Sequence, residues 1–130
     1  MDLQKTILVD AIGAFVIEDE GIYAPLHEML DSFPNRKVIL TNADDSQMRT
    51  FGLDSMPYEV FTLKHNPNKS SHEYYRSMLL HFGFSVSDVI YFEHDIDAVR
   101  SAQSVGINTF HYDENRRNVE ELRGFLSRYA

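Results

Sequence analysis

At residues 7–14 the chain reads ILVDAIGA, an apolar run that ends in Asp10 and is followed by a small, glycine-containing turn. This pattern predicts a buried β-strand that carries one carboxylate at its carboxyl end. Such a position suits a nucleophile or a cation ligand, because ligands bind outside the carboxyl ends of the strands in open α/β sheets. Ile12 stands where a phosphoryl-transfer site of this shape usually has a second acid. The turn therefore supplies one of the two acids that such a site usually uses.

Composition narrows the class of protein. A length of 130 residues predicts a single domain. The net charge of −8 argues against a nucleic-acid-binding surface and against contact with anionic membranes. The chain has no cysteine, which excludes a disulfide framework, thiol catalysis and a cysteine zinc site. The amino terminus lacks the apolar core of a signal peptide, and no apolar run approaches membrane-spanning length. These features predict a cytoplasmic protein.

Strand-like and helix-like segments alternate along the chain. The strand-like runs are mostly apolar throughout, as in a sheet covered on both faces, and lie at 7–10, 37–42, 59–64, 89–93 and 108–112. Four helical patterns lie between and after these runs. The first follows Pro25, and the second begins at a capping box of Ser70 and Glu73 and ends at Gly83. The third ends at Gly106, and the fourth lies at 119–129. This alternation predicts an α/β fold: a three-layer α/β/α sandwich with a mainly parallel, five-stranded Rossmann-like sheet.

Polar residues gather where three of these strands end. Asp10 ends the first strand, Thr41 and Asn42 end the second, and residues 93–95 (EHD) end the fourth. The same strands are apolar until their last residues, so these clusters predict a ligand site at the carboxyl edge of the sheet. By contrast, the acids at 44–45 are expected to start a helix, because acidic residues suit the first turn.

Four stretches, in order, resemble the motifs of the haloacid dehalogenase-like (HAD) superfamily, whose members are mostly phosphatases and related phosphotransferases. Residues 9–14 (VDAIGA) are similar to the first motif, Asp-x-Asp-Gly-Thr, and 38–42 (VILTN) to the second, an apolar strand that ends in Thr or Ser. Lys69 sits like the third-motif lysine. Residues 91–95 (YFEHD) and 101–107 (SAQSVGI) resemble the last motif in the nucleotidase-like branch. The resemblance implies a HAD-like sheet, and 1–130 is expected to form one domain without a cap.

The resemblance also implies roles for individual residues. Asp10 would be the nucleophile that forms an aspartyl-phosphate. Thr41 and Asn42 would bind the phosphoryl group. Lys69 would both bind phosphate and neutralise charge during catalysis, so the catalytic set is Asp10, Thr41 and Lys69.

Two positions depart from the family pattern. Ile12 cannot donate a proton to a leaving group, and such help is typically worth roughly 10²–10⁴-fold in rate. His94 replaces an anionic ligand of Mg²⁺, the cofactor that the resemblance implies, and magnesium prefers oxygen ligands to imidazole. A small shift of register would let Asp95 or Glu93 restore that ligand, so the tentative metal ligands are Asp10 and Asp95.

Two main functions follow. The first is a weak or degenerate phosphatase that uses Asp10. The second is a catalytically inactive HAD-like domain that binds a phosphorylated small molecule or macromolecule, or a protein partner. A receiver domain fits less well, because its phosphoacceptor would follow the third strand. A haloacid dehalogenase would need a helical cap, for which the segment between Asp10 and Thr41 is too short. An uncapped crevice is also compatible with a homodimer.

Overall fold

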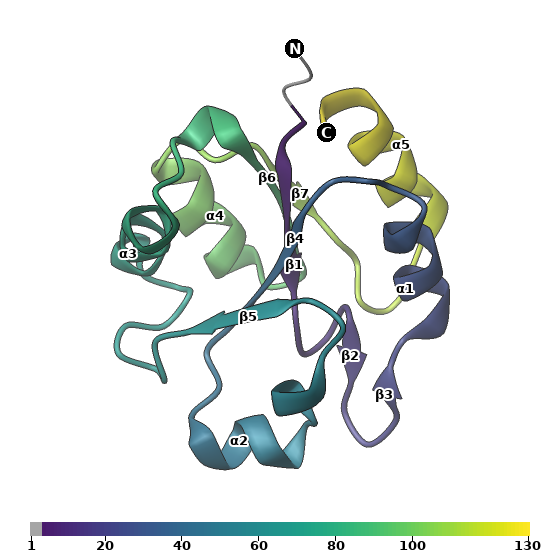
Figure 1. Cartoon of the computed structure of the whole chain (residues 1–130), viewed down its shortest axis with the longest axis horizontal. Helices are drawn as coiled ribbons and strands as arrows, with labels where there is room; N and C mark the ends of the chain where they lie inside the picture. Colours follow the sequence, from purple (N-terminus) through teal and green to yellow (C-terminus); the bar gives the residue numbers. More distant parts are fainter. Residues whose placement is uncertain (1–3) are drawn as a thin grey trace.

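The computed structural model describes residues 4–130, and its centre is a five-stranded parallel sheet in the order β5-β4-β1-β6-β7 (Figure 1). The strands are β1 Thr6–Asp10, β4 Lys37–Thr41, β5 Glu59–Thr62, β6 Val89–Glu93 and β7 Thr109–His111. β1 is central, and its register pairs Val9 with Ile39 of β4 and with Phe92 of β6. The predicted parallel five-stranded α/β sandwich is confirmed.

Helices cover both faces of this sheet. The helices are α1 Ala24–Asp31, α2 Asp45–Thr50, α3 His72–Phe82, α4 Ile96–Ser104 and α5 Val119–Tyr129. Figure 1 shows α1 and α5 on one side and α3 and α4 on the other, while α2 lies beyond the carboxyl edge of the strands. Because side chains alternate along a strand, Ile7 and Val9 pack towards α1 and α5, whereas Leu8 packs towards α3.

The helix termini follow local chemistry. Pro25 lies in the first turn of α1, where its missing N–H costs nothing. Gly83 ends α3 in the left-handed conformation. Asp44 caps α2 and shares a capping box with Gln47, as expected for acids at a helix start. The predicted capping box of Ser70 and Glu73 is wrong: Ser71 is the N-cap of α3, and its hydroxyl accepts a hydrogen bond from the Glu73 amide.

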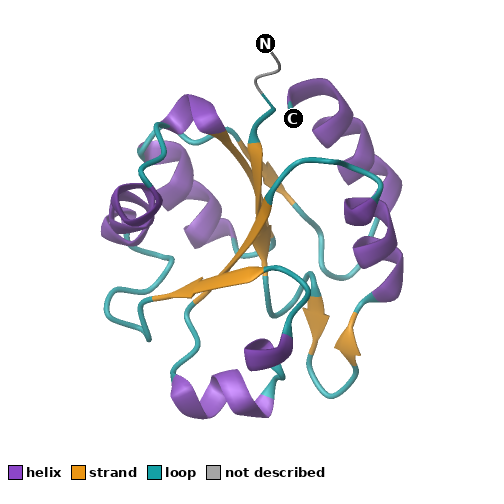
Figure 2. Cartoon of the chain, in the orientation of Figure 1, coloured by secondary structure: helices purple, strands orange, loops and turns teal. Residues whose placement is uncertain are grey.

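A short hairpin and two 3₁₀ turns lie outside the elements that the sequence predicts. After β1, a hairpin of β2 Val16–Ile17 and β3 Gly21–Ile22 stands beside the carboxyl edge of the sheet (Figure 2). Two 3₁₀ turns, Leu53–Ser55 and Val86–Asp88, precede β5 and β6. In the described residues, the segment between β1 and β4 contains only this hairpin and α1. No helix in the part of the chain that the structure describes is long and apolar enough to cross a membrane.

Candidate functional site

Two strands and one loop place the predicted site residues together. Asp10 is the last residue of β1, and Thr41 is the last residue of β4. Lys69 comes from the loop between β5 and α3, and its backbone N–H donates to Asn42 Oδ1 at 2.7 Å. This hydrogen bond ties the loop to the end of β4. The structure therefore gathers Asp10, Thr41, Asn42 and Lys69 at one edge of the sheet, as the sequence predicted.

Lys69 is the centre of a buried ion cluster. Its Nζ donates to Asp10 Oδ1 at 2.8 Å, to Glu93 Oε1 at 2.8 Å and to the carbonyl oxygen of Leu40 at 3.2 Å. Glu93 ends β6 and is fully buried, so the ammonium group joins carboxylates from two neighbouring strands. Unpaired charges at this depth would be strongly destabilising, and the geometry leaves neither carboxylate unpaired.

His94 closes the same cluster from the other side. Its ring Nδ1 contacts Asp10 Oδ2 and lies 3.3 Å from Glu93 Oε2. Its backbone N–H also donates to Asp10 Oδ2 at 3.1 Å. On its other edge, Nε2 lies 3.8 Å from a carboxylate oxygen of Glu114. The imidazole is thus surrounded by acidic groups.

The turn after β1 holds the His94 ring in place. Gly13 has a φ of +100°, and a Cβ built there would stand 2.6–2.9 Å from three ring atoms of His94. Atoms at such distances overlap, so the turn can pass this close to the ring only because Gly13 has no side chain. The glycine that marked the turn in the sequence therefore has a second role, which is to admit His94.

The charges of the cluster are interdependent. Burial and the negative charge of Glu93 raise the pKa of Asp10, although Lys69 and His94 oppose that rise. Burial alone would raise the pKa of Glu93, but the charge of Lys69 and the hydrogen bonds from His94, Lys69 and Tyr91 together outweigh it, so the pKa is lowered. Burial would lower the pKa of His94, yet its hydrogen bonds with Asp10 and Glu93 raise the pKa to about 10. The cluster thus brings two carboxyl groups, the Lys69 ammonium group and the His94 ring into direct contact, so that the titration of each group depends on the others.

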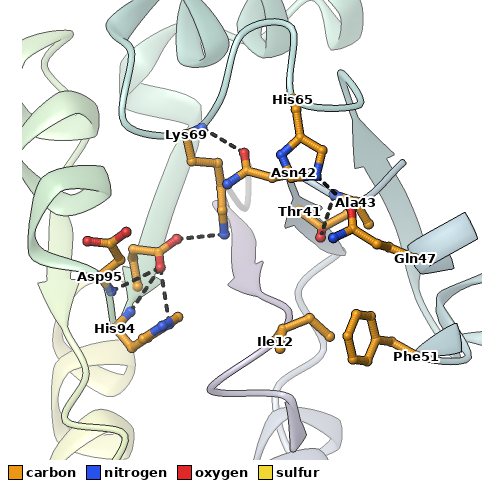
Figure 3. A pocket seen from close by; sticks show the side chains of 11 residues that line it. Ile12, Thr41, Asn42, Ala43, Gln47, Phe51, His65, Lys69, His94 and Asp95 are labelled. Carbon is orange, nitrogen blue, oxygen red and sulfur yellow. Dashed lines mark hydrogen bonds and ion pairs between the residues drawn. The ribbon is translucent and has the colours of Figure 1, made fainter. Parts of the chain in front are cut away.

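A pocket of about 250 Å³ opens beside this cluster. Figure 3 draws Ile12 and Phe51 on one side of it and His94 and Asp95 on the other. Thr41, Asn42, Gln47, His65 and Lys69 supply further polar lining. Asp10 is fully buried and is not among the lining residues, but its carboxylate contacts Lys69 and His94, which do line the pocket.

Some site residues went unnoticed in the sequence. His65 and Gln47 line the pocket and contact each other, with Nε2 2.6 Å from Oε1, although they lie in a loop and in α2. Tyr91 donates its hydroxyl proton to Glu93 Oε1. A signal for that contact existed, because residues two apart on a strand point to the same face. No comparable signal joins His65 to Gln47.

Asp95 caps a helix, whereas the sequence predicts it as a tentative metal ligand. Its carboxylate accepts a hydrogen bond from the Asp97 amide at 3.0 Å and so caps α4. The side chains that converge as possible ligands are Asp10, Glu93 and His94. The structure therefore places Glu93, and not Asp95, beside Asp10.

Comparison with known proteins bears on the fold. No family model matches the sequence, and no curated protein matches it. Solved structures do match. A HAD family enzyme from Bacteroides thetaiotaomicron, an aspartate-to-alanine variant in complex with magnesium and inorganic phosphate, aligns with a TM-score of 0.69 at 11% identity over 85% of this chain and 95% of that one. A HAD-superfamily hydrolase from Geobacter sulfurreducens aligns with a TM-score of 0.56 at 24% identity over 79% and 56%.

The chain has the HAD fold. A third structure agrees: the cobalt-bound deoxy-D-mannose-octulosonate 8-phosphate phosphatase from Haemophilus influenzae has a TM-score of 0.59 at 11% identity over 97% of this chain and 88% of that one. At such identities the likeness establishes the HAD fold and leaves the chemistry to the residues present. The expected capless single domain and homodimer stay predictions.

The residues present do not fit the magnesium ion that the HAD fold implies. Each of the four carboxylate oxygens already accepts a hydrogen bond: Asp10 Oδ1 and Glu93 Oε1 from Lys69, Asp10 Oδ2 from the backbone N–H of His94, and Glu93 Oε2 from the backbone N–H groups of His94 and Asp95. The third candidate ligand is an imidazole, which magnesium disfavours. This set lacks the open oxygen ligands that magnesium requires.

Proposed function

We propose that this chain is a HAD-fold domain that binds a phosphorylated ligand in the pocket beside Asp10 without hydrolysing it. The observation that carries the proposal is the enclosure of Asp10. A nucleophilic carboxylate must present a free oxygen to phosphorus, and both oxygens of Asp10 are engaged, one by Lys69 and one by His94. The side chain is 1% exposed.

The second part of the argument is the missing proton donor. Ile12 stands in the pocket wall at the place where an acid would protonate the leaving group, and its side chain has no proton to give. The loss of general acid catalysis is worth about 10²–10⁴-fold in rate. An enclosed nucleophile and an absent acid act on the same step, so the geometry supports binding better than turnover.

The pocket retains donors for an anion. The Thr41 hydroxyl accepts from the Ala43 amide at 3.2 Å, so its own proton is available for donation. The Oδ1 atom of Asn42 accepts from Lys69, which leaves the NH₂ group of that amide as a donor. The ring of His94 adds positive charge at the opposite wall. Neutral donors backed by one imidazolium suit a phosphoryl group, and the apolar Ile12 and Phe51 suit the organic part of a monoester.

The test uses p-nitrophenyl phosphate and inorganic phosphate as probes. We expect calorimetry to detect binding of both, and we expect no release of p-nitrophenolate above that of the Asp10→Asn variant. Turnover by the native chain that Asp10→Asn abolishes would instead establish the weak phosphatase. Absence of binding by either probe would contradict the ligand assignment.

A matched pair of variants locates the ligand. Thr41→Val removes a donor in the pocket, whereas Thr50→Val makes the same change at an exposed position outside it. Hydrogen bonds to charged groups contribute about 1.5–3 kcal/mol, which corresponds to about ten- to hundredfold in Kd. We expect that loss in Thr41→Val alone. Equal affinities in the two variants would place the ligand elsewhere.

A further inference from the structure

A second group of polar side chains borders the pocket on the side away from the buried cluster (Figure 3). Gln47 comes from α2, and His65 comes from the loop between β5 and α3. His65 Nε2 lies 2.6 Å from Gln47 Oε1, so the two side chains join the loop to the helix. Thr62 adds to this connection, because its hydroxyl donates to the carbonyl oxygen of Ala43 at 2.6 Å. Hydrogen bonds between α2 and the loop therefore hold this wall of the pocket together.

The contacts of Gln47 fix the orientation of its amide. The backbone N–H of Asp44 lies 3.0 Å from Gln47 Oε1 and can only donate, so the atom that faces it is the oxygen. His65 Nε2 meets the same oxygen and must therefore carry a hydrogen atom. A rotated amide would set its NH₂ group against two donors. Both contacts thus use the oxygen and leave the NH₂ group as a donor, and Figure 3 draws this nitrogen towards the middle of the pocket.

Phe51 places an aromatic ring beside that donor. Gln47 and Phe51 lie one turn apart at the end of α2, so they share a face of the helix, and both line the pocket. Figure 1 shows α2 beyond the carboxyl edge of the strands, whereas Thr41, a donor in the proposed phosphoryl site, is the last residue of β4. Gln47 and Phe51 therefore border the outer part of the pocket, where the organic group of a bound monoester would lie.

We propose that the pocket selects the phosphate monoester of a planar aromatic group that carries an oxygen acceptor, with Phe51 packing against the ring and the Gln47 NH₂ group donating to the acceptor. This specificity rests on the proposed function, because it concerns the ligand of the same pocket. Aromatic pairs gain free energy beyond that of the area they bury. A donor that is already oriented loses little conformational freedom on binding. Phe51 and Gln47 thus recognise the shape and the polarity of the organic group.

The experiment compares phenyl phosphate with the ortho, meta and para isomers of acetylphenyl phosphate, by calorimetry on the native chain. Each isomer adds one carbonyl acceptor to the same ring and phosphate. A hydrogen bond between neutral groups contributes about two- to tenfold in Kd, and we expect at least one isomer to bind more tightly than phenyl phosphate by about that factor. Equal or weaker binding of all three isomers would overturn the inference and leave the proposed phosphate binding intact. Failure of every probe to bind would overturn both.

Gln47→Glu tests whether Gln47 is the donor. Glutamate keeps an oxygen for Asp44 and His65, and it is a usual capping-box residue at this position, so we expect α2 to be retained. It exchanges the NH₂ group for a second oxygen that has no proton to give at neutral pH. The added charge weakens the binding of every phosphate, so the readout is the ratio of the Kd of phenyl phosphate to that of the preferred isomer.

We expect Gln47→Glu to lower this ratio by about the two- to tenfold that the hydrogen bond contributes. Gln103→Glu adds the same charge at an exposed position of α4 outside the pocket, and we expect it to leave the ratio unchanged. An unchanged ratio in Gln47→Glu would overturn the inference, because Gln47 would then contact the phosphoryl group or no part of the ligand.

His65 is a positioning residue in this proposal, because it acts through Gln47. His65→Phe keeps an aromatic ring in the loop and removes the donor to Gln47 Oε1, whereas His65→Gln retains an amide donor. We expect the ratio to fall in His65→Phe and to be largely restored in His65→Gln. Equal ratios in the two variants would overturn the positioning role of His65.

Discussion

Lys69 joins carboxylates on two strands through a single ammonium group, and its side chain is 8% exposed. Lys69→Met keeps the length of the side chain and removes its charge, which leaves Asp10 and Glu93 facing each other with one fewer cation. Removal of one partner of a buried ion pair costs about 3–5 kcal/mol. We expect a loss of stability of about that size in urea unfolding.

Lys64→Met is the control for that variant. Lys64 also pairs with an acid, Asp45, at 3.0 Å, but its side chain is 57% exposed. Exposed ion pairs contribute about 0–1 kcal/mol, so we expect little change in the free energy of unfolding. Equal effects of the two substitutions would mean that burial of Lys69 adds nothing to its ion pairs.

His94 gives a pH dependence whose sign follows from its surroundings. Asp10, Glu93 and Glu114 face the ring, and the first two raise its pKa from 6.5 to about 10 against the effect of burial. A raised pKa means that the folded state holds the proton more tightly, so the stabilisation is complete below pH 6.5 and disappears as the pH rises to about 10. We expect the stability difference between the native chain and His94→Gln to shrink across that range. A difference that is constant from pH 6 to pH 10 would contradict the protonated ring.

At the scale of elements, the turn after β1 is the most informative. Gly13 and Gly21 both have positive φ values, +100° and +88°, but only a Cβ on Gly13 would overlap another group, the His94 ring. Alanine at either position carries the backbone penalty of about 1–2 kcal/mol. We expect Gly13→Ala to lose about 1–3 kcal/mol more than Gly21→Ala, as overpacked sites do. Equal losses in thermal unfolding would show that the ring moves aside freely.

Substitutions of Asp95 test whether its side chain serves only as the N-cap of α4. Asparagine caps a helix about as well as aspartate, whereas alanine in place of a capping residue costs about 1 kcal/mol. We therefore expect Asp95→Asn to leave the free energy of unfolding nearly unchanged and Asp95→Ala to lower it by that amount, since the side chain accepts from the Asp97 amide. If Asp95→Asn is as damaging as Asp95→Ala, its charge has a role beyond the cap.

The elements also show where sequence reasoning succeeds and where it fails. The predicted strand at 89–93 coincides with β6, because an apolar run between polar residues defines a buried strand. The predicted cap of α3 at Ser70 lies one residue before the observed cap, since Ser70 and Ser71 are chemically equivalent and only the backbone distinguishes them. The β2–β3 hairpin has strands of two residues each, too short to produce a periodic pattern.

For the molecule as a whole, topology made part of the site predictable. Parallel strands end at one edge, so Asp10 and Thr41 had to lie near each other. Lys69 was found through resemblance alone, because its partner is 59 positions away in the chain. The sequence does not reveal the pairing itself, which is that Lys69 bridges two carboxyl groups and that His94, 84 positions from Asp10, contacts the same aspartate. Those contacts depend on side-chain geometry at the carboxyl edge of the sheet.

For the whole molecule, a comparison of two salts distinguishes the screening of surface charge from the specific binding of a metal ion. With a net charge of −8, the acidic groups on the surface repel one another, and salt weakens that repulsion. Raising NaCl from about 10 mM to about 150 mM shortens the Debye length from about 30 Å to about 8 Å, so we expect Tm to rise. Asp10, Glu93 and Lys69 are buried, so salt screens their charges much less than it screens those of the surface. If the cluster holds no dication, MgCl₂ at the same ionic strength should raise Tm as much as NaCl does, in the native chain and in Asp10→Asn alike. A larger rise with MgCl₂ that disappears in Asp10→Asn would mean that the acid at the end of β1 still holds a metal.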